Sequence, residues 1–576
     1  MSGFAGAVAA DVTRRRLLLG RLAGGAPGES VRQAELPGLG LAAVGVRDVE
    51  LASDVAEGAA LVVSGYLRRG AVPWSSRELL TRCLREGPEA LLRAEGEWSA
   101  ALWLGRELFL ARDRVGSRPL YAARLGGDLV FATSIAALVR AGVPADRDRH
   151  AVACSLVLGY VPAPGTALTR VEQVGPAEVW RIRGNAVRRR LHHRFEERVD
   201  RRRSLAAAAR RLDRVVTECV EHALPAAGKI GAFLSGGIDS SLVLARVHEA
   251  GREVQPFTLH FGDRLPGEIR YARAVAEHLG LPLEVLELGA REFCAALPEA
   301  IAQLEDALSE PIAVPNFVLA RLAARSVDTL FTGEGGDPSF GGPKNVGLVL
   351  AQLYGGLPLA PSVAETYLAA HHHLADDLER ALTPEILEGF RRSELLSRVA
   401  VDLSPRRGQT VVGRWMRANV LWKGGNNILV KVAKMVGASG LALRSPLFDP
   451  ALVDLAMTIP PWQKLRGTEE KVCLKLAARR SLPRPVVERP KRGMAVPLSA
   501  WLRGELGSLA RDVLTESRVR QRGFFRWSYV EKLLSREEQP TELARSRTAE
   551  KLWLLLVTEL HQLSLDSLER EVRDAA

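Results

Sequence analysis

Apolar and polar positions alternate in short runs over the first 180 residues. Strand-like runs lie at 41–46, 60–67, 98–104, 107–113, 119–125 and 128–134, and glycine, proline or charged residues separate them. Short runs with such breaks are typical of β-strands joined by turns. We therefore predict that the N-terminal part of the chain is rich in β-sheet.

The segment from Arg181 to Ser204 interrupts this pattern. It is basic, weakly apolar and without a clear period, which is typical of a solvated connection between domains. We place the interdomain linker there and expect two domains, residues 1–190 and residues 191–576.

From Leu205 onward the apolar positions recur with helical spacing. Short apolar strands interrupt the helical pattern at 229–235, 254–261 and 328–333, and a helical run follows each of them. Strands that alternate with helices in this way form a parallel sheet. The stretch from about residue 405 onward is helical and is expected to close over that sheet. The predicted fold class is α/β with two domains, an α+β sandwich followed by a parallel-sheet α/β domain with added helices.

Charge and cysteine content narrow the class of protein further. Lys and Arg number 79 against 67 Asp and Glu, a formal net charge of +12, so an anionic partner is expected. The five cysteines lie far apart without CxxC spacing, which argues against a disulfide framework or a zinc site and favours a reducing cytosol. The N-terminus lacks the order of a secretory signal, and no apolar stretch is long enough to span a bilayer. We expect a cytoplasmic protein with no membrane partner and, without a recognisable binding motif, no nucleic-acid partner.

The sharpest chemical signal is the segment FLSGGIDSS at 233–241, between an apolar strand and a helical run. A Ser-Gly-Gly turn lets backbone N–H groups approach a phosphate closely, and the start of the next helix adds donors and a positive dipole end. Asp239 can hold Mg²⁺ against the phosphate oxygens. Because the spacing and lysine of a Walker loop are missing, we expect attack at the α-phosphate of ATP with loss of pyrophosphate. The alternative is an ordinary turn between strand and helix.

This loop and later segments together resemble a known family. SGGIDSS is similar to the pyrophosphate loop of the ATP-pyrophosphatase superfamily. TGEGGDPSFGG from Thr332, RSPLFD from Arg444 and EKVCLK from Glu470 resemble elements of asparagine synthetases. ARDRVGSRPLY from Ala111 and FATS from Phe131 resemble the glutamine-hydrolysing domain of the same family. The resemblance covers nearly the whole chain and implies an Ntn-hydrolase-like sandwich in front of an ATP-pyrophosphatase domain.

The chain departs from this family at its first residues. The family opens with Met-Cys-Gly and uses the exposed cysteine to attack glutamine, whereas this chain opens with Met1-Ser2-Gly3. A serine hydroxyl is far less acidic than a thiol. In addition, Ser64 stands where the family has an asparagine that holds the oxyanion. We predict an inactive amidotransferase-like domain, with a weak serine glutaminase as the alternative.

Without an internal ammonia supply, the acceptor amine is expected in the substrate itself. β-Lactam synthetase, carbapenam synthetase and the lasso peptide cyclases are relatives that lack the cysteine. The first two place a tyrosine at the position of Glu334, whereas GEGGD from Gly333 resembles asparagine synthetases and lasso cyclases. Pro338 and Ala442 stand where asparagine synthetases have glutamate, which argues against recognition of aspartate.

The resemblance therefore implies macrolactam formation in a leader-free precursor peptide, as in a lasso peptide cyclase. ATP and Mg²⁺ would activate an Asp or Glu side chain as an acyl-adenylate, and the N-terminal amine of the peptide would displace AMP. A leader-recognition protein and a leader peptidase are the implied partners. Two alternatives stay open: a β-lactam-type or ammonia-dependent asparagine synthetase, and a non-catalytic scaffold that binds a peptide.

The motifs assign candidate roles to individual residues. We expect Asp239 and Asp337 to bind Mg²⁺. Lys471 is expected to neutralise charge at the α-phosphate, and Glu334 to orient or deprotonate the amine. The loop residues expected to cradle pyrophosphate are Ser235, Gly236, Gly237 and Ser240. The resemblance also implies that adenosine is contacted by Leu234, Leu259 and Gly333.

For three further groups of residues we weigh a functional role against a structural one. Lys491 and Arg492 either bind phosphate or form a solvated surface loop. The run His371, His372 and His373 lacks the spacing of metal ligands and is interpreted as an exposed helix face. The tryptophans that either line a peptide groove or pack in the core are Trp415, Trp422 and Trp462.

Overall fold

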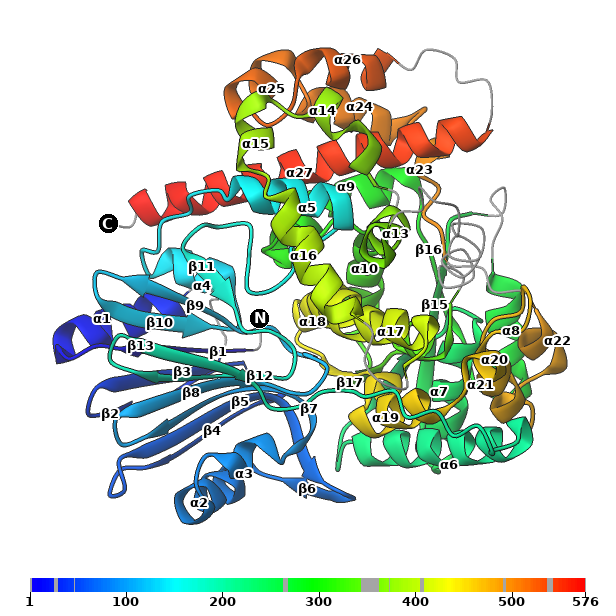
Figure 1. Cartoon of the computed structure of the whole chain (residues 1–576), viewed down its shortest axis with the longest axis horizontal. Coiled ribbons are helices and arrows are strands. Elements are labelled where there is room, and N and C mark those ends of the chain that lie inside the picture. Colours follow the sequence, from blue (N-terminus) through cyan, green and yellow to red (C-terminus); the bar gives the residue numbers. More distant parts are fainter. Residues whose placement is uncertain are drawn as a thin grey trace.

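Two antiparallel sheets face each other in the N-terminal part of the computed structural model (Figure 1). The structure describes residues 3–24, 30–45, 47–262, 268–342, 362–371, 373–404, 409–489, 494–535 and 542–574. The first sheet has the order β11 (Val171–Gln173), β9 (Tyr121–Leu125), β10 (Asp128–Ala132), β1 (Gly3–Val8), β3 (Leu39–Val44) and β2 (Val31–Leu36). The second has the order β13 (Ala186–Leu191), β12 (Glu178–Arg183), β8 (Glu107–Arg112), β7 (Glu95–Leu104), β5 (Ala59–Arg69) and β4 (Val49–Asp54), with β6 (Val72–Trp74) beside β5.

Side chains from the inner faces of the two sheets form a shared core. Phe4 and Phe131 of the first sheet pack with Val62 and Trp180 of the second, as the alternation of side chains along each strand requires. The outer face of the first sheet is covered by α1 (Val12–Ala23) and α4 (Ile135–Arg140). The outer face of the second is covered by α2 (Ser76–Glu86) and α3 (Glu89–Leu92). The predicted α+β sandwich is confirmed.

The prediction of a linker over residues 181–204 is wrong for its first half. Residues up to Leu191 form a hairpin of β12 and β13, and regular structure resumes only at Leu205. Every residue of β13 is exposed, so this edge strand has no apolar alternation for a sequence pattern to reveal. Its long side chains still pack on the sheet, because the Arg189 guanidinium lies 4.2 Å from the centre of the Trp180 ring.

A parallel sheet forms the centre of the second part of the chain, as predicted. Its order is β16 (Glu284–Glu287), β15 (Val254–His260), β14 (Ile230–Phe233), β17 (Thr329–Phe331) and β18 (Ala442–Arg444). One face packs on α6 (Leu205–Ala223), α7 (Ile238–Glu249) and α8 (Ile269–His278). The other packs on α10 (Ala313–Ala323) and α18 (Leu429–Gly437). The short strands β16 and β18 carried no signal of their own in the sequence.

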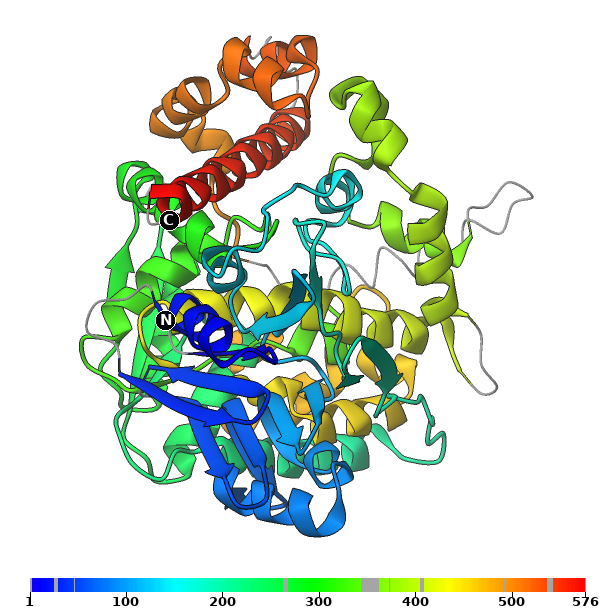
Figure 2. The ribbon, with the colours of Figure 1, turned by 90° about the vertical axis from the view of Figure 1, so that its left-hand side faces the viewer.

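Many of the other helices share a buried apolar cluster with the longest helix, α27 (Glu542–Asp574), and form a helical layer. They include α5 (Arg149–Leu158), α9 (Ala290–Leu304), α13 (Val363–Ala369), α15 (Pro384–Gly389), α16 (Arg392–Leu403), α17 (Val411–Ala418), α23 (Leu498–Trp501), α24 (Glu505–Val513), α25 (Glu516–Arg522) and α26 (Trp527–Ser535). In Figures 1 and 2, α27 (red) lies below the orange helices and above the sandwich. None of the helices in the described ranges carries an apolar segment long enough to cross a membrane.

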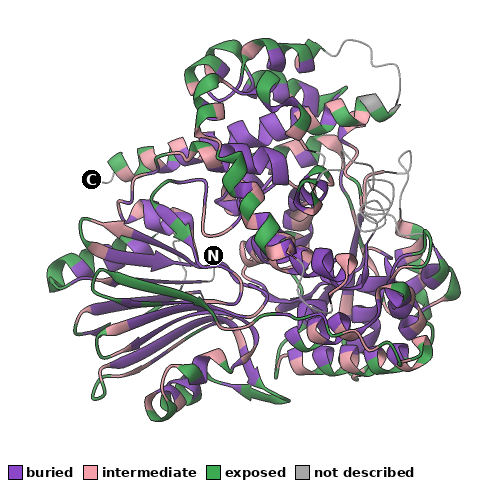
Figure 3. Cartoon of the chain, in the orientation of Figure 1, coloured by how far each residue is buried: buried purple, intermediate pink, exposed green. Residues whose placement is uncertain are grey.

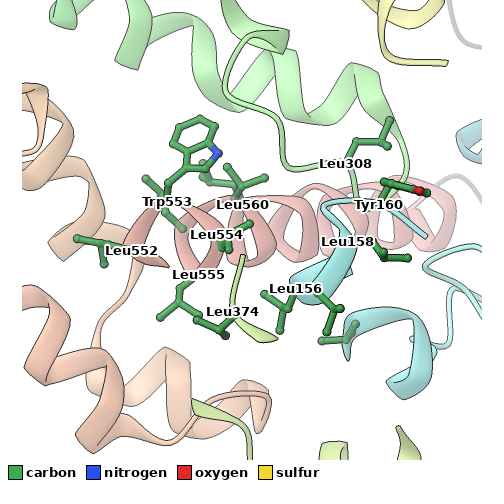
Figure 4. Close-up of a cluster of buried hydrophobic side chains, with 14 of the residues drawn as sticks. Leu156, Leu158, Tyr160, Leu308, Leu374, Leu552, Trp553, Leu554, Leu555 and Leu560 are labelled. Atoms are coloured by element: carbon green, nitrogen blue, oxygen red, sulfur yellow. The ribbon is translucent and has the colours of Figure 1, made fainter. Parts of the chain in front are cut away.

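Large apolar side chains anchor α27 in this layer (Figure 4). Leu555 and Trp553 of α27 belong to the same buried cluster as Leu156 of α5, and the Trp553 indole N–H donates to the carbonyl of Ser309 (2.6 Å). Figure 3 shows this buried interior in purple. Helix α5 comes from residues 1–190 yet packs in this layer, so the division of the chain at residue 190 stays a prediction.

Buried ion pairs join the sandwich to the second part of the chain. The Lys434 ammonium of α18 contacts Glu305 (2.7 Å) and donates to the carbonyl of Thr133 (3.0 Å). Glu305 in turn accepts hydrogen bonds from the Ser134 hydroxyl and the Ile135 N–H at the start of α4, both at 2.7 Å. Because Lys434 and Glu305 are each only 3% exposed, solvent screens this pair little.

We expect Lys434→Met to destabilise the protein strongly. The substitution leaves the Glu305 carboxylate buried without its cation, which typically costs about 3–5 kcal/mol. The control is Arg16→Met, since Arg16 pairs with Glu35 at the surface, where its side chain is 66% exposed, and such pairs contribute about 1 kcal/mol or less. Thermal unfolding followed by circular dichroism should show a much larger fall in midpoint for Lys434→Met. Equal midpoints for the two variants would contradict the interpretation.

Candidate active site

A cavity lined by several acidic and hydroxyl side chains lies at the carboxyl ends of β14 and β17. The two strands are neighbours, and the chain leaves β14 toward β15 on one side, whereas β17 lies on the other. Ligands of open α/β sheets bind at such a reversal of strand order. The cavity there has a volume of about 500 Å³ and is lined by the loops that follow both strands.

Serine hydroxyls hold the loop that follows β14. The Ser235 hydroxyl accepts the Gly237 N–H (3.2 Å), and the Ser240 hydroxyl accepts the Ser235 N–H (3.1 Å). The two hydroxyl oxygens lie 3.0 Å apart. Gly236 has a φ of +71°, and a Cβ at this position would come within 2.5 Å of the Ala272 nitrogen. The loop therefore has a fixed shape that only glycine permits at its centre.

The loop that follows β17 touches the first turn of α7. A Cβ at Gly333 would come within 2.3 Å of the Ser240 nitrogen, and one at Gly336 within 2.1 Å of the Asp239 carboxylate. This close approach places Glu334 and Asp337 on the wall of the same cavity as Asp239. Asp337 begins the first turn of α11 (Gly336–Phe340). The structure thus brings the predicted residues of both loops together.

Lys471 joins the two loops from a third element. It precedes α21 (Val472–Ala478), is fully buried, and its ammonium forms ion pairs with both Asp239 and Asp337. Burial by itself lowers the pKa of Lys471, but the two carboxylates outweigh it, so the pKa lies above its usual value. Lys471 is therefore a cation throughout the neutral and alkaline range.

The same residues fit a metal-bound nucleotide. Asp239 and Asp337 offer carboxylate oxygens from neighbouring loops, the type of ligand that Mg²⁺ prefers, and Mg²⁺ usually takes one or two protein carboxylates together with substrate phosphates. Over the described ranges, no group of three or more His, Cys, Asp or Glu side chains could hold a metal. Leu234, Leu259 and Gly333 also line the cavity.

A second charged group at this cavity was missed by the motif analysis. Lys423 lines the cavity, and its ammonium lies 3.2 Å from the Glu310 carboxylate. Lys431 of α18 forms an ion pair with the other oxygen of Glu310. Lys423 belongs to η2 (Asn419–Ile428), a π-helical segment, and such segments are frequent at functional sites. The pair Gly424-Gly425 within a helical run is the signal that could have drawn attention to it.

The interpretation of the histidine run as an exposed face is wrong for His371. This side chain is buried, lines the cavity, and has its Nδ1 3.0 Å from the Tyr367 carbonyl. His371 follows α13 (Val363–Ala369), and this helix packs inward because Tyr367 and its neighbours join the apolar layer. His372 lies outside the described residues.

Two of the three tryptophans are buried, and two predicted residues lie outside the described part of the chain. Trp415 and Trp422 pack in the core of the helical layer, whereas Trp462 is exposed. Lys491 and Ser2 lie outside the described residues, so their placement stays a prediction.

Charged side chains fill the region around Ser64. Asp48 binds Arg444 at 2.8 and 2.9 Å, and Glu97 pairs with Arg118 at 3.2 Å. The Arg444 guanidinium also lies 4.5 Å from the centre of the Tyr66 ring. The cavity that remains beside Ser64 has a volume of only about 50 Å³.

Comparisons with known proteins agree with these two regions. Residues 211–567 match the sequence model of a family described as asparagine synthase, and residues 74–195 match that of a glutamine amidotransferase domain. A putative glutamine-hydrolysing asparagine synthetase of Mycobacterium bovis is 31% identical over 456 residues, which cover 73% of this chain and 70% of that protein. Asparagine synthetase 1 of Bacillus subtilis is 25% identical over 499 residues, 81% of this chain and 77% of that protein.

A third relative acts on a different substrate. The carboxyethyl-arginine β-lactam synthase of Streptomyces clavuligerus is 30% identical over 290 residues, which cover 48% of this chain and 52% of that protein. The asparagine synthase match extends over more than half of this chain and contains both glycine loops and Lys471. The chain therefore belongs to the asparagine synthase family, whose members are ATP-dependent carbon–nitrogen ligases that form AMP and pyrophosphate.

Proposed function

We propose that this protein closes a macrolactam ring in a leader-free precursor peptide. One observation carries the proposal: the residues expected to activate a carboxylate lie close together, whereas the N-terminal domain departs from glutamine-hydrolysing relatives at Ser2 and Ser64. Asp239, Asp337 and Glu334 line one cavity of about 500 Å³, and Lys471 forms ion pairs with both aspartates. With no ammonia from glutamine, the amine has to come from the substrate or from solution.

The N-terminal domain supports this reading at two places. The chain begins Met1-Ser2 in place of the Met-Cys start of glutamine-hydrolysing relatives, so the thiol nucleophile is missing. Around Ser64, ion pairs leave a cavity of about 50 Å³, a tenth of the volume at the nucleotide site. The domain is better suited to a structural role than to holding glutamine.

The first half-reaction would form an acyl-adenylate. An oxygen of the substrate carboxylate attacks the α-phosphorus of ATP, and the bond to the pyrophosphate oxygen breaks. Lys471, a buried cation, would neutralise the charge that develops on the α-phosphate. Mg²⁺, when bound by Asp239 and Asp337, would neutralise the departing pyrophosphate. The loop from Ser235 to Ser240, together with the start of α7, would bind the same phosphates.

The second half-reaction would form the amide. The N-terminal amine attacks the activated carbonyl carbon, a C–N bond forms, and the bond from carbon to the AMP oxygen breaks. An ammonium has no lone pair, so a base must take a proton from the amine. Glu334 lies on the cavity wall and would take this proton.

A second candidate function is a synthetase of small molecules. The similarity to the β-lactam synthase of Streptomyces clavuligerus favours it. Against it, Glu334 stands where the ring-forming small-molecule enzymes place tyrosine, and Pro338 and Ala442 replace glutamates of the asparagine synthetases. A non-catalytic peptide-binding scaffold is disfavoured, because burying a lysine between two carboxylates costs desolvation free energy. A chemical role for these charges would explain why that cost is tolerated. As a lasso-type cyclase, the protein would work in the cytoplasm with a leader-recognition protein and a leader peptidase.

The peptide assignment is tested by mass spectrometry. Leader-free peptides with a free N-terminus and an internal Asp or Glu are incubated with the protein, ATP and Mg²⁺, and AMP and pyrophosphate are quantified. We expect loss of one water together with one AMP. Glu334→Gln should keep pyrophosphate exchange but lose most ring closure, because it removes the base of the second step only. AMP formation driven by ammonia or a small amino acid, with unchanged peptides, would favour the second candidate.

Lys471→Met should abolish most activation. Removal of a positioned charge at the transition state typically costs about 10²–10³ in rate, so pyrophosphate release should fall by that factor. Lys229→Met is the control, since Lys229 is exposed and precedes β14 at the opposite end of the strand. Stopped assays of pyrophosphate at saturating ATP give the comparison. Similar rates in both variants would remove Lys471 from the chemistry.

Ser2 should have no role in the reaction. We expect Ser2→Ala to keep the full rate of AMP formation, and the wild-type protein to release no glutamate from glutamine. Ser2→Cys should not create a glutaminase, because the region around Ser64 stays filled by ion pairs. Glutamate release is measured by an enzyme-coupled assay; release that disappears in Ser2→Ala would show a serine glutaminase instead.

A further inference from the structure

Three charged residues at the cavity wall, of which Lys431 is buried and the other two are partly buried, together carry one surplus positive charge. Glu310 carries one negative charge, and the ammonium groups of Lys423 and Lys431 contact its two oxygens. Of these three residues, only Lys423 lines the cavity, where 21% of its side chain is exposed. The surplus charge of this group therefore faces the cavity through Lys423. An anion bound in the cavity would therefore pair with the Lys423 ammonium.

The backbone holds Lys423 in this position. The wide turns of η2 (Asn419–Ile428) end at the start of α18, which carries Lys431. A Cβ at Gly424 would come within 2.8 Å of the Phe448 ring, and one at Gly425 within 2.4 Å of Pro176. The Gly425 carbonyl also accepts a hydrogen bond from Arg112 of the sandwich (2.9 Å). The segment is thus packed on both sides, and Lys423 is presented from a rigid support.

Lys423 stays charged at neutral pH. Glu310 raises the pKa of Lys423, burial opposes this, and Asp337 and Glu334 raise it further. The last two residues belong to the loop that follows β17, so Lys423 is within electrostatic range of the reacting groups. Lys471 already faces the two carboxylates expected to hold Mg²⁺. Lys423 therefore adds a cation to the cavity lining itself, from a different element than Lys471.

We propose that Lys423 binds the carboxylate of the acyl donor before it is adenylated, and that Glu310 and Lys431 position Lys423 for this. The inference rests on the proposed function, which begins with a carboxylate that approaches a triphosphate. Both groups are anionic and repel each other unless a cation lies beside the carboxylate. An ammonium that donates a hydrogen bond to the carboxylate supplies both charge and orientation. The carboxylate then leaves Lys423 as its oxygen bonds to the α-phosphorus.

The experiment measures selectivity for a carboxylate over a carboxamide. Binding of two peptides is compared by calorimetry with α,β-methylene-ATP and Mg²⁺: a peptide that the protein cyclises, and its analogue with the donor Asp or Glu changed to Asn or Gln. A charged hydrogen bond in a buried site is worth about a tenfold difference in Kd or more. We expect the wild-type protein to prefer the carboxylate by at least this factor, Lys423→Met to lose the preference, and Lys423→Arg to retain most of it.

Lys551→Met is the matched control. Lys551 lies 2.6 Å from Asp377, and 26% of its side chain is exposed, so it resembles Lys423 in burial and pairing but lies outside the cavity lining. The control should keep the carboxylate preference. Because each ratio is measured within one variant, a loss of folded protein does not change it. An unchanged ratio in Lys423→Met, or no preference in the wild-type protein, overturns the proposal.

Failure of the proposed function gives a different result. If no peptide is cyclised, the same ratio is measured for L-aspartate and L-asparagine, the donor and product of an asparagine synthetase. A preference for aspartate that disappears in Lys423→Met would keep Lys423 as the carboxylate site of a small-molecule enzyme. A preference that persists in Lys423→Met would reject the role of Lys423 in either enzyme.

Discussion

The ion pairs of one buried lysine hold the catalytic end of the parallel sheet together. Lys471 precedes α21, and its ammonium contacts Asp239 after β14 and Asp337 after β17. Two carboxylates at this separation repel each other strongly in a buried setting unless a cation lies between them. The lysine therefore sets how closely the two loops approach. That approach places the loop from Ser235 to Ser240, which is expected to bind phosphates, and the proposed base Glu334 on one cavity.

The glycines of these loops follow from the same constraint. Gly333 and Gly336 lie against the first turn of α7, where a Cβ would come within 2.3 Å of the Ser240 nitrogen and 2.1 Å of the Asp239 carboxylate. Gly335 has a φ of +117° and packs on Leu447. A side chain at any of these positions would push the loop away from Lys471 and separate the two carboxylates. The motif GEGGD is thus a packing requirement as much as a chemical one.

A feature could be predicted from the sequence where the residue types present have a single physical explanation. The Ser-Gly-Gly turn, the alternation of strands with helices and Lys471 are all examples. Lys423 was missed because its position depends on a π-helical turn and on a partner, Glu310, more than a hundred residues away. β13 was missed because an exposed edge strand has no apolar face. His371 was misjudged, because its burial depends on how the preceding helix α13 packs and not on the local run of histidines.

The sandwich supports the loop that carries Glu334 through hydrogen bonds and ion pairs. The Thr332 N–H donates to the carbonyl of Arg444 (2.9 Å), and this arginine is held by Asp48 of the sandwich. The next residue, Ser445, donates its N–H to Glu97 (2.6 Å) and has its hydroxyl 3.2 Å from that of Thr332. The loop that carries Glu334 is therefore oriented, through Thr332 two residues before it, by charges of the N-terminal domain. If the sandwich supplies no ammonia, as proposed, this support gives it a structural role in the enzyme.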